Sequence, residues 1–323
     1  RQFRVKMCGI TGFVSKDVAE PADARAARLD RMCASIIYRG PDEQGTVVAG
    51  RAALGMRRLS IIDIKTGQQP IFTEDGNLAI VFNGEIYNFQ ELKRELSSLG
   101  HSFKTNSDTE VIVHAYEEYG EKCLDKLRGM FSFAIWDLRS ESLFIARDRI
   151  GKKPLFYTLT DDGEFIFGSE LKTLFVHGGF EKKVDPAALD AYLSFGYVPE
   201  EFCIIDNVKK LPPGFFLRYQ GGKVETHRYW DLNLTAVEER PEGEWADLLF
   251  EKIREAVQIR LISEVPLGAF LSGGVDSSTI VGMMSQLSSK PVKTFSIGFH
   301  EDSFDELKYA RIAARHFGTD HHE

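Results

Sequence analysis

Cys8 is the first residue whose type and position suggest covalent chemistry. It stands at the head of a short apolar segment, residues 9–14. A cysteine attacks as the thiolate, and little thiolate forms at neutral pH from a thiol of ordinary pKa unless a base lies near. A free α-amino group on the same cysteine is such a base, because it is partly neutral near neutral pH. Cys8 is therefore a candidate nucleophile, on condition that it is the amino-terminal residue.

Residues 1–7 precede Cys8 in the chain, so the α-amine of Cys8 is not free. The peptide bond between Met7 and Cys8 turns the amine of Cys8 into an amide, which has no useful basicity. We expect residues 1–7 to be a leader or tag to be removed, or a mis-assigned start. The alternative is that Cys8 is a small buried residue at the start of a strand, as unreactive cysteines commonly are.

The composition indicates a globular protein of two domains, since the 323 residues are 43% hydrophobic and 27% charged. A formal net charge of −8 without a basic cluster argues against a nucleic-acid partner. There is no membrane-spanning apolar segment and no signal peptide, so we expect a cytoplasmic protein without a membrane partner. The 4 cysteines are scattered without a C-x-x-C pair, which argues against a disulfide framework and a zinc site.

Short apolar runs bounded by turn residues predict strands in the first part of the chain. They lie at residues 9–14, 52–56, 78–82, 131–136, 143–147 and 165–168. Helical periodicity predicts helices at residues 24–37, 89–99 and 109–119. Strands and helices segregated in this way favour a layered α+β domain.

Polar residues at the ends of these elements are candidates for binding a small amino acid. Arg58 could clamp a carboxylate, although a surface arginine is the plain alternative. Asn83 and Gly84 offer the two N–H donors of an oxyanion hole, but the pair is equally typical of a hairpin turn. Glu85 and Asp108 could hold an ammonium group, and capping a helix is the alternative for Asp108.

Five ordered motifs in this part of the chain resemble the glutaminase domain of class II amidotransferases. They are Cys-Gly-Ile at 8–10, Arg-Gly-Pro-Asp at 39–42, Arg-Leu-Ser-Ile at 58–61, Asn-Gly-Glu-Ile-Tyr-Asn at 83–88 and Ser-Asp-Thr-Glu at 107–110. Further motifs narrow the resemblance to glutamine-hydrolysing asparagine synthetases. They are Gly-Met-Phe-Ser-Phe-Ala at 129–134, Arg-Asp-Arg-Ile-Gly-Lys-Lys-Pro-Leu at 147–155 and Ser-Glu-Leu-Lys at 169–172.

The resemblance implies that Cys8 is the nucleophile and that Asn83, with the N–H of Gly84, forms the oxyanion hole. It also implies a set of residues that bind glutamine, namely Arg58, Glu85 and Asp108 for the α-carboxylate and α-amino groups, and Leu59 and Ile61 for the shape of the pocket. The implied fold is a four-layer αββα sandwich of the N-terminal nucleophile hydrolase type, over residues 8–200.

A second domain is predicted after a connector. A helix is predicted at 185–195, and residues 201–243 are predicted to be a connecting hairpin, with strands at 215–219 and 224–229, and a linker. Residues 244–323 alternate between helices at 245–262, 279–287 and 306–317 and strands at 267–271 and 292–299. This order favours an α/β fold with a parallel sheet and a nucleotide site at the carboxyl ends of its strands.

A glycine-rich loop, residues 272–278, lies between a predicted strand and helix of this domain. Backbone N–H groups at such a helix start bind phosphate well, whereas the alternative is a plain glycine-rich turn. The absence of Gly-Lys-Ser/Thr excludes a Walker A loop. The loop resembles that of ATP pyrophosphatases. This implies ATP binding by Leu271, Ser272, Gly273, Gly274, Asp276, Ser277 and Ile297, with Mg²⁺ held at Asp276.

Together the resemblances imply an ATP-dependent carbon–nitrogen ligase that makes asparagine. Glutamine hydrolysis at Cys8 would supply ammonia to an aspartyl-AMP made from aspartate and ATP, giving asparagine, AMP, pyrophosphate and glutamate. We expect the ATP domain to be incomplete, with the aspartate site beyond Glu323. The open alternatives are an amidotransferase of the same architecture with another carboxylate acceptor, and a non-catalytic relative. A homodimer is also left open.

Overall fold

The computed structural model describes residues 7–16, 19–235, 238–301 and 305–323. The chain divides into two compact units, Arg1–Leu232 and Asn233–Glu323. In the described part of the chain, no helix has both the length and the apolar character needed to cross a membrane.

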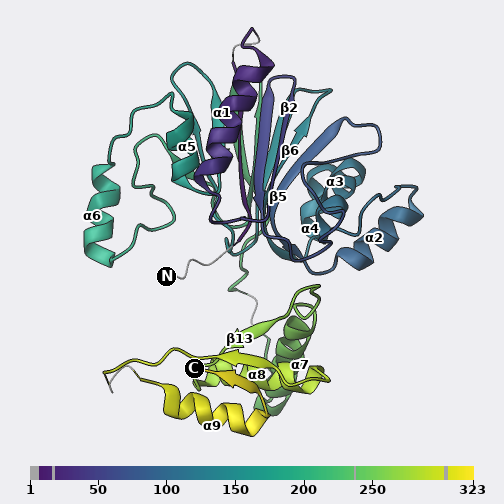
Figure 1. Cartoon of the computed structure of the whole chain (residues 1–323), viewed down its shortest axis with the longest axis vertical. Helices are drawn as coiled ribbons and strands as arrows, with labels where there is room; N and C mark the ends of the chain where they lie inside the picture. The colour runs from purple at the N-terminus through teal and green to yellow at the C-terminus, as the bar shows by residue number, and fades with distance from the viewer. Residues whose placement is uncertain (1–6, 17–18, 236–237, 302–304) are drawn as a thin grey trace. The chain divides into compact units, whose positions relative to one another are not determined.

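Two antiparallel sheets form the centre of the first unit (Figure 1). In spatial order the first sheet contains β10 (Lys209–Lys210), β8 (Phe156–Leu159), β9 (Phe165–Gly168), β1 (Gly9–Val14), β3 (Ala52–Arg58) and β2 (Glu43–Ala49). The second contains β12 (Lys223–Arg228), β11 (Phe215–Gln220), β7 (Ser142–Arg147), β6 (Gly129–Asp137), β5 (Leu78–Ile86) and β4 (Ile71–Phe72).

Helices cover the outer face of each sheet (Figure 1). The first sheet is covered by α1 (Ala22–Ser35) and α5 (Leu171–His177), and the second by α2 (Phe89–Ser98), α3 (Asp108–Tyr119), a 3-10 turn (Gly120–Lys122) and α4 (Cys123–Lys126). Between the sheets lies a separate core that contains Ile10, Leu54, Val81 and Trp136. These layers make an α+β sandwich, as predicted.

Several strands of the first unit were not predicted from the sequence. These are β2, β4, β8 and β10; all but β8 lie at sheet edges, and β2 is only half-buried. Because an edge strand buries little of its surface, it carries a weak apolar pattern. The turn proposed as an alternative for Asn83 and Gly84 is also wrong, because both residues lie inside β5.

The hairpin placed in the connector at 201–243 belongs instead to the first unit. β11 pairs with β7 from Phe216 to Gln220, and β12 pairs with β11. Leu217 and Tyr219 of β11 are buried in the core between the sheets. The physical reason is that β11 alternates buried and exposed side chains and so completes the second sheet.

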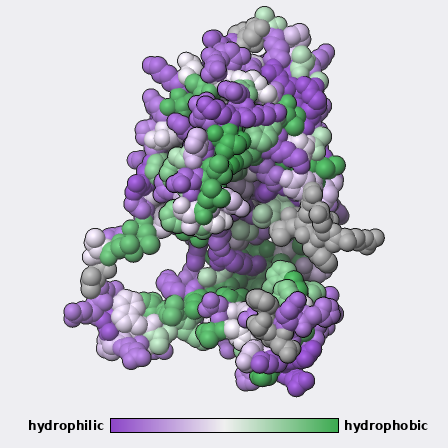
Figure 2. Space-filling view, turned by 90° about the vertical axis from the view of Figure 1, so that its left-hand side faces the viewer, coloured by the Kyte–Doolittle hydropathy of each residue, from purple (hydrophilic) through white to green (hydrophobic). Residues whose placement is uncertain are grey.

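Helix α6 (Pro186–Phe195) begins at Asp185, whose carboxylate accepts hydrogen bonds from the N–H groups of Ala187 and Ala188. It carries exposed apolar side chains, including Leu193 at 75% and Phe195 at 66% exposure. The face of the molecule that carries α6 accordingly has apolar surface among polar surroundings (Figure 2).

The second unit contains a parallel sheet of β13 (Gly268–Phe270), β14 (Lys293–Phe295) and β15 (Asp320–His322). Its helices are α7 (Glu242–Gln258), α8 (Val275–Leu287) and α9 (Leu307–Phe317). Apolar residues of α8 and α9, including Val281 and Ala310, pack around Leu271. The predicted parallel arrangement is therefore present. β15 was not predicted, because its polar residues have no strand pattern.

Candidate active site

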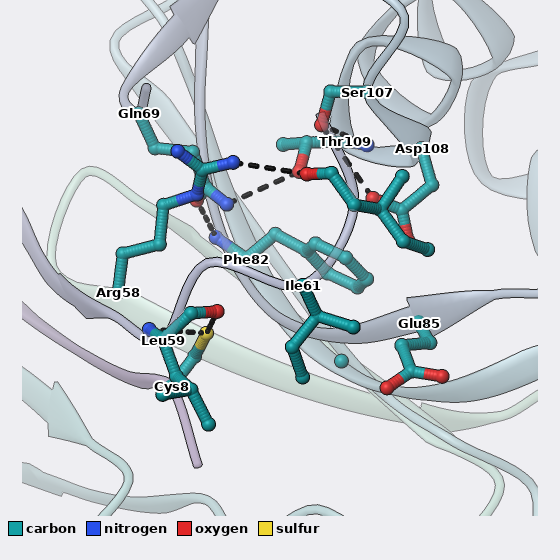
Figure 3. Close-up of a pocket in the computed structure, with 12 residues that line it drawn as sticks. Cys8, Arg58, Leu59, Ile61, Gln69, Phe82, Glu85, Ser107, Asp108 and Thr109 are labelled. Carbon is teal, nitrogen blue, oxygen red and sulfur yellow. Dashed lines mark hydrogen bonds between the residues drawn. The ribbon is translucent and has the colours of Figure 1, made fainter. Parts of the chain in front are cut away.

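One pocket in the first unit gathers most of the residues predicted to act on glutamine (Figure 3). Cys8 lies directly before β1, Arg58 ends β3, and Gly84 and Glu85 lie near the end of β5. The pocket is lined by Cys8, Arg58, Leu59, Ile61, Gly84, Glu85 and Asp108. Strand ends from both sheets and the first residue of α3 therefore meet here.

The thiol of Cys8 is held by the backbone of Leu59. The Leu59 N–H donates to Cys8 Sγ at 3.3 Å, and Sγ is 3.5 Å from the Leu59 carbonyl oxygen. Burial raises the pKa of the Cys8 thiol above its ordinary value, while the Leu59 N–H and the cationic Lys153 and Arg58 act in the opposite direction. The effect of burial on the thiol is therefore larger than the opposing effect of these neighbours.

The backbone around Cys8 is fixed by Arg39. Its Nε donates to the Cys8 carbonyl oxygen at 2.9 Å, and its carbonyl accepts the Met7 N–H at 2.8 Å. Arg39 Nη1 pairs with Glu170 at 3.0 Å. Arg39 and Glu170 come from two of the quoted motifs, so these motifs meet behind the thiol and position it.

Arg58 anchors the loop that covers the pocket. Its guanidinium donates to the carbonyl oxygens of Ile62 and Asp63 at 3.0 and 2.6 Å, and it pairs with Glu43 at 2.8 Å. These bonds hold residues 59–63 in place after β3. Arg58 therefore combines a structural role with its position in the pocket wall.

Asp108 and Glu85 give the pocket an acidic side, across from Cys8 and Arg58 in Figure 3. Ser107 caps α3 by accepting the Thr109 N–H, so Asp108 does not act as the cap. Instead Asp108 accepts the Ile86 N–H at 2.9 Å. Burial, and also the Glu85 carboxylate, raise the pKa of Asp108 to about 7, although the Ile86 N–H opposes this.

Asn83 does not lie in the pocket with the other residues predicted to act on glutamine. It is fully buried, it does not line the pocket, and its Nδ2 is 3.5 Å from Ser132 Oγ. Phe82, Gly84 and Glu85 of the same strand do line the pocket. The structure therefore brings Gly84, but not the Asn83 side chain, to the pocket wall.

Five residues of the pocket wall were not predicted from the sequence: Ile62, Gln69, Phe82, Ser107 and Thr109. Gln69 shows why. Its side chain accepts the Phe82 N–H at 2.7 Å and donates to Thr109 at 3.1 Å, which ties β5 to α3. Gln69 belongs to no motif, so only the folded chain reveals this role. Ser107 and Thr109 lie within the Ser-Asp-Thr-Glu motif, and this motif could have indicated that they belong to the pocket wall.

The second unit has its own pocket, with a volume of about 340 Å³, at the start of α8. Of the residues predicted to bind ATP, its lining includes Leu271, Ser272, Ser277 and Ile297, but not Gly273, Gly274 or Asp276. The Ser272 and Ser277 hydroxyls are 3.0 Å apart and close the loop. At Gly273, where φ is +82°, a Cβ would lie 2.3 Å from the Tyr309 carbonyl carbon, so only glycine fits.

Two protein families match the chain. The family described as the glutamine amidotransferase domain matches residues 7–230, and the asparagine synthase family matches residues 248–323. Among curated proteins, the chain is 40% identical over 321 residues to asparagine synthetase [glutamine-hydrolyzing] 1 of Bacillus subtilis (strain 168), covering 97% of this chain and 49% of that protein. It is 36% identical over 343 residues to a putative asparagine synthetase [glutamine-hydrolyzing] 2 of Methanocaldococcus jannaschii, covering 98% and 64%.

The chain thus spans about half the length of the curated relatives it matches. Among solved structures, the allosteric regulatory enzyme of purine biosynthesis aligns with a TM-score of 0.51 at 18% identity, covering 98% of this chain and 64% of that one. This likeness supports the fold alone.

Proposed function

The chain belongs to the glutamine amidotransferase domain family, and from this membership we propose that its first unit hydrolyses glutamine with Cys8 as the nucleophile. The observation that carries the proposal is the pocket shared by Cys8, Arg58, Glu85 and Asp108. It combines a thiol, a cation for the α-carboxylate and two carboxylates for the α-ammonium group.

The chemistry divides into two steps. The free α-amine of Cys8, formed when residues 1–7 are removed, takes the thiol proton as Sγ bonds to the amide carbon of glutamine. The negative oxygen is stabilised by N–H donors, for which Asn83 and Gly84 are proposed. The carbon–nitrogen bond then breaks, ammonia leaves with the proton, and water hydrolyses the glutamyl thioester to glutamate and the thiol.

Burial raises the pKa of the Cys8 thiol, so the proposed mechanism includes a base that takes its proton. A thiol that stays protonated at neutral pH needs proton transfer within the reaction rather than a standing thiolate.

For the second unit we propose ATP binding and, in the complete protein, asparagine synthesis. The match to the asparagine synthase family and the names of the relatives support aspartate as the acceptor. Aspartate would attack the α-phosphorus of ATP, releasing pyrophosphate, and ammonia would displace AMP from the resulting aspartyl-AMP. Ser272, Gly273, Gly274 and Ser277 would hold the phosphates at the start of α8.

The exposed carboxylate of Asp276 suits Mg²⁺, because this ion is usually held by one or two carboxylates together with phosphate oxygens. Bound there, Mg²⁺ would neutralise phosphate charge. A cytoplasmic location and a homodimer remain proposals, and sedimentation of the complete protein tests the second.

Glutamine hydrolysis is tested with three matched proteins: residues 8–323, residues 1–323, and residues 8–323 with Cys8→Ala. We expect glutamate and ammonia only from the first, because only it has both a thiol and a free amine. Equal hydrolysis by the Cys8→Ala protein would reject the assignment.

The synthetic reaction is tested with the complete protein beginning at Cys8, supplied with glutamine, Mg-ATP and aspartate. We expect asparagine, AMP and pyrophosphate in equal amounts. Glutamate release without aspartate-dependent AMP would keep the first proposal and require another carboxylate acceptor.

A further inference from the structure

A cluster of histidine and glutamate side chains lies in the first unit among residues that do not line the glutamine pocket. It consists of Glu74, in the turn between β4 and β5, His101, after α2, and His114 and Glu117, on α3. One donor atom from each lies within 4.8 Å of the other three. Three separate segments of the chain therefore converge on one point.

His114 is the buried centre of this cluster. Its side chain is 1% exposed, and neither ring nitrogen makes a hydrogen bond in the described part of the chain. Its Nδ1 is 3.5 Å from Glu74 Oε2 and 3.5 Å from Glu117 Oε2. The ring nitrogens of His114 therefore face carboxylates at ion-pair distance but lack a hydrogen bond of normal length, and burial of a nitrogen without one is costly.

The spacing of the donor atoms suits a metal ion. In a tetrahedral site with bonds of about 2.1 Å, neighbouring donor atoms are about 3.4 Å apart. The two contacts of His114 Nδ1 and the contact between His101 Nδ1 and Glu117 Oε2 are each 3.5 Å. Three edges of such a tetrahedron are therefore already in place.

Two further carboxylates, outside the proposed donor set, lie next to the two histidines. His101 Nε2 is 3.2 Å from Glu118 Oε2, and His114 Nε2 is 3.8 Å from Glu110 Oε1. Glu110 is itself fixed by the N–H groups of Lys104 and Thr105, each at 2.7 Å. His101 thus turns Nδ1 to the centre and Nε2 to a carboxylate at hydrogen-bond distance, the usual arrangement of metal-binding histidines, whereas His114 Nε2 faces Glu110 at a longer distance.

Charge and donor type indicate which ion would bind. Four carboxylates surround two imidazoles, so a divalent cation would reduce the excess of negative charge. Imidazole nitrogen suits zinc and its neighbours in the first transition series, whereas Mg²⁺ and Ca²⁺ take oxygen donors. We propose that Glu74, His101, His114 and Glu117 form a binding site for a divalent transition metal ion of the Zn²⁺ class.

The prediction that the chain has no zinc site rested on its cysteine spacing, and this donor set contains no cysteine. A metal ion here would join the turn at Glu74 and the segment at His101 to α3. Because α3 begins at Asp108, the proposed site would also stabilise the helix that carries one wall of the glutamine pocket.

The test is calorimetric titration of Zn²⁺ into the 323-residue chain, prepared without a polyhistidine tag, stripped with chelator and carrying Cys8→Ser to remove a competing thiol. We expect one Zn²⁺ per chain and a rise in Tm on binding. Glu117→Gln should weaken binding by at least about 100-fold, and Glu118→Gln by roughly 10-fold to 100-fold, as outer-shell changes do. The matched control is Glu91→Gln, an exposed residue of α2.

Co²⁺ provides an independent readout, because a tetrahedral site gives intense visible absorption. We expect this absorption with Glu91→Gln and its loss with Glu117→Gln or His101→Gln. These two residues are more exposed than His114, so their variants disturb the core less. Absence of Zn²⁺ binding, or equal Zn²⁺ affinity of Glu117→Gln and Glu91→Gln, would overturn the proposal. Neither measurement depends on glutamine hydrolysis.

Discussion

Cys8 Sγ and the backbone of Leu59 are joined by a hydrogen bond of 3.3 Å from the Leu59 N–H to the sulfur. Leu59 is the first residue after β3, and Arg58 anchors the loop that follows it. The thiol is therefore positioned by the adjacent strand of the first sheet, and its reactivity depends on the charges around this contact.

Lys153 is predicted to increase the reactivity of Cys8. Its ammonium group favours the thiolate, and burial lowers its own pKa while Glu85 and Cys8 oppose that change. Lys153→Met should raise the pKa of Cys8 and slow its alkylation by iodoacetamide roughly threefold to tenfold near neutral pH. The measurement is the alkylation rate against pH, with the modified peptide identified by mass spectrometry.

The matched control for this prediction is Lys152→Met, which removes the exposed neighbouring lysine. Cys33, Cys123 and Cys203 are buried and should react slowly in every variant. Equal alkylation rates for the two lysine variants would show that Lys153 has no influence on the thiol.

Asp108 is predicted to make the first unit less stable as pH rises. Its pKa is about 7 in the fold and 3.8 ordinarily, so between these values the folded state holds a proton that the unfolded state has lost. The free energy of unfolding therefore falls as pH rises through this range, by up to about 4 kcal/mol. Asp108→Asn should remove this contribution, because an amide does not ionise.

The measurement is urea unfolding at several pH values, from about pH 5 to about pH 8. Asp125→Asn, an exposed change on α4, is the control and should keep the wild-type dependence. Parallel curves for wild type and Asp108→Asn would contradict the assigned pKa. If Asp108 also holds the ammonium group of glutamine, the same variant should raise KM for glutamine.

The motif residues were the predictable part of this site. Arg58, Glu85 and Asp108 line one pocket with Cys8 because each stands at the end of an element whose apolar pattern is strong. Gln69 was beyond prediction, since its importance comes from contacts with Phe82 and Thr109 that form only in the folded chain.

In the fold and in the histidine cluster too, features with a local sequence pattern could be predicted, and features that depend on contacts in the folded chain could not. Central strands such as β5 and β6 are buried along most of their length and were found, whereas the edge strands β2, β4 and β10 and the four-residue strand β8 were not. Glu74, His101 and His114 come from separate segments with no shared spacing, so no local pattern could have joined them.

Gly84 is predicted to be required for the pairing of β5 with β6. A Cβ at this position would lie 2.1 Å from the Met130 carbonyl oxygen and 2.8 Å from the Phe131 Cα. Gly84→Ala should therefore force the strands apart and lower the stability by about 1–3 kcal/mol. The control is Gly243→Ala in α7, where nothing lies within 4 Å of the added atom. A Tm for Gly84→Ala equal to that of wild type would contradict the close approach.

Asn83 provides the sharpest test of the proposed oxyanion hole. Its Oδ1 is buried without a hydrogen-bond partner in the described part of the chain, and its Nδ2 lies 3.5 Å from Ser132 Oγ. If the amide donates to the negative oxygen of the transition state, Asn83→Ala should lower kcat for glutamine hydrolysis by about 10²–10³ and leave KM nearly unchanged. Ser132→Ala should lower kcat less, because it removes only a neighbour that positions the amide.

The measurement is steady-state hydrolysis by residues 8–323 carrying each substitution, with far-UV circular dichroism to confirm the fold. A KM-dominated loss in Asn83→Ala would instead assign Asn83 to ground-state binding, since an interaction made only in the transition state changes kcat. An unchanged kcat and KM would remove Asn83 from the mechanism and leave backbone donors such as the Gly84 N–H to stabilise the oxygen.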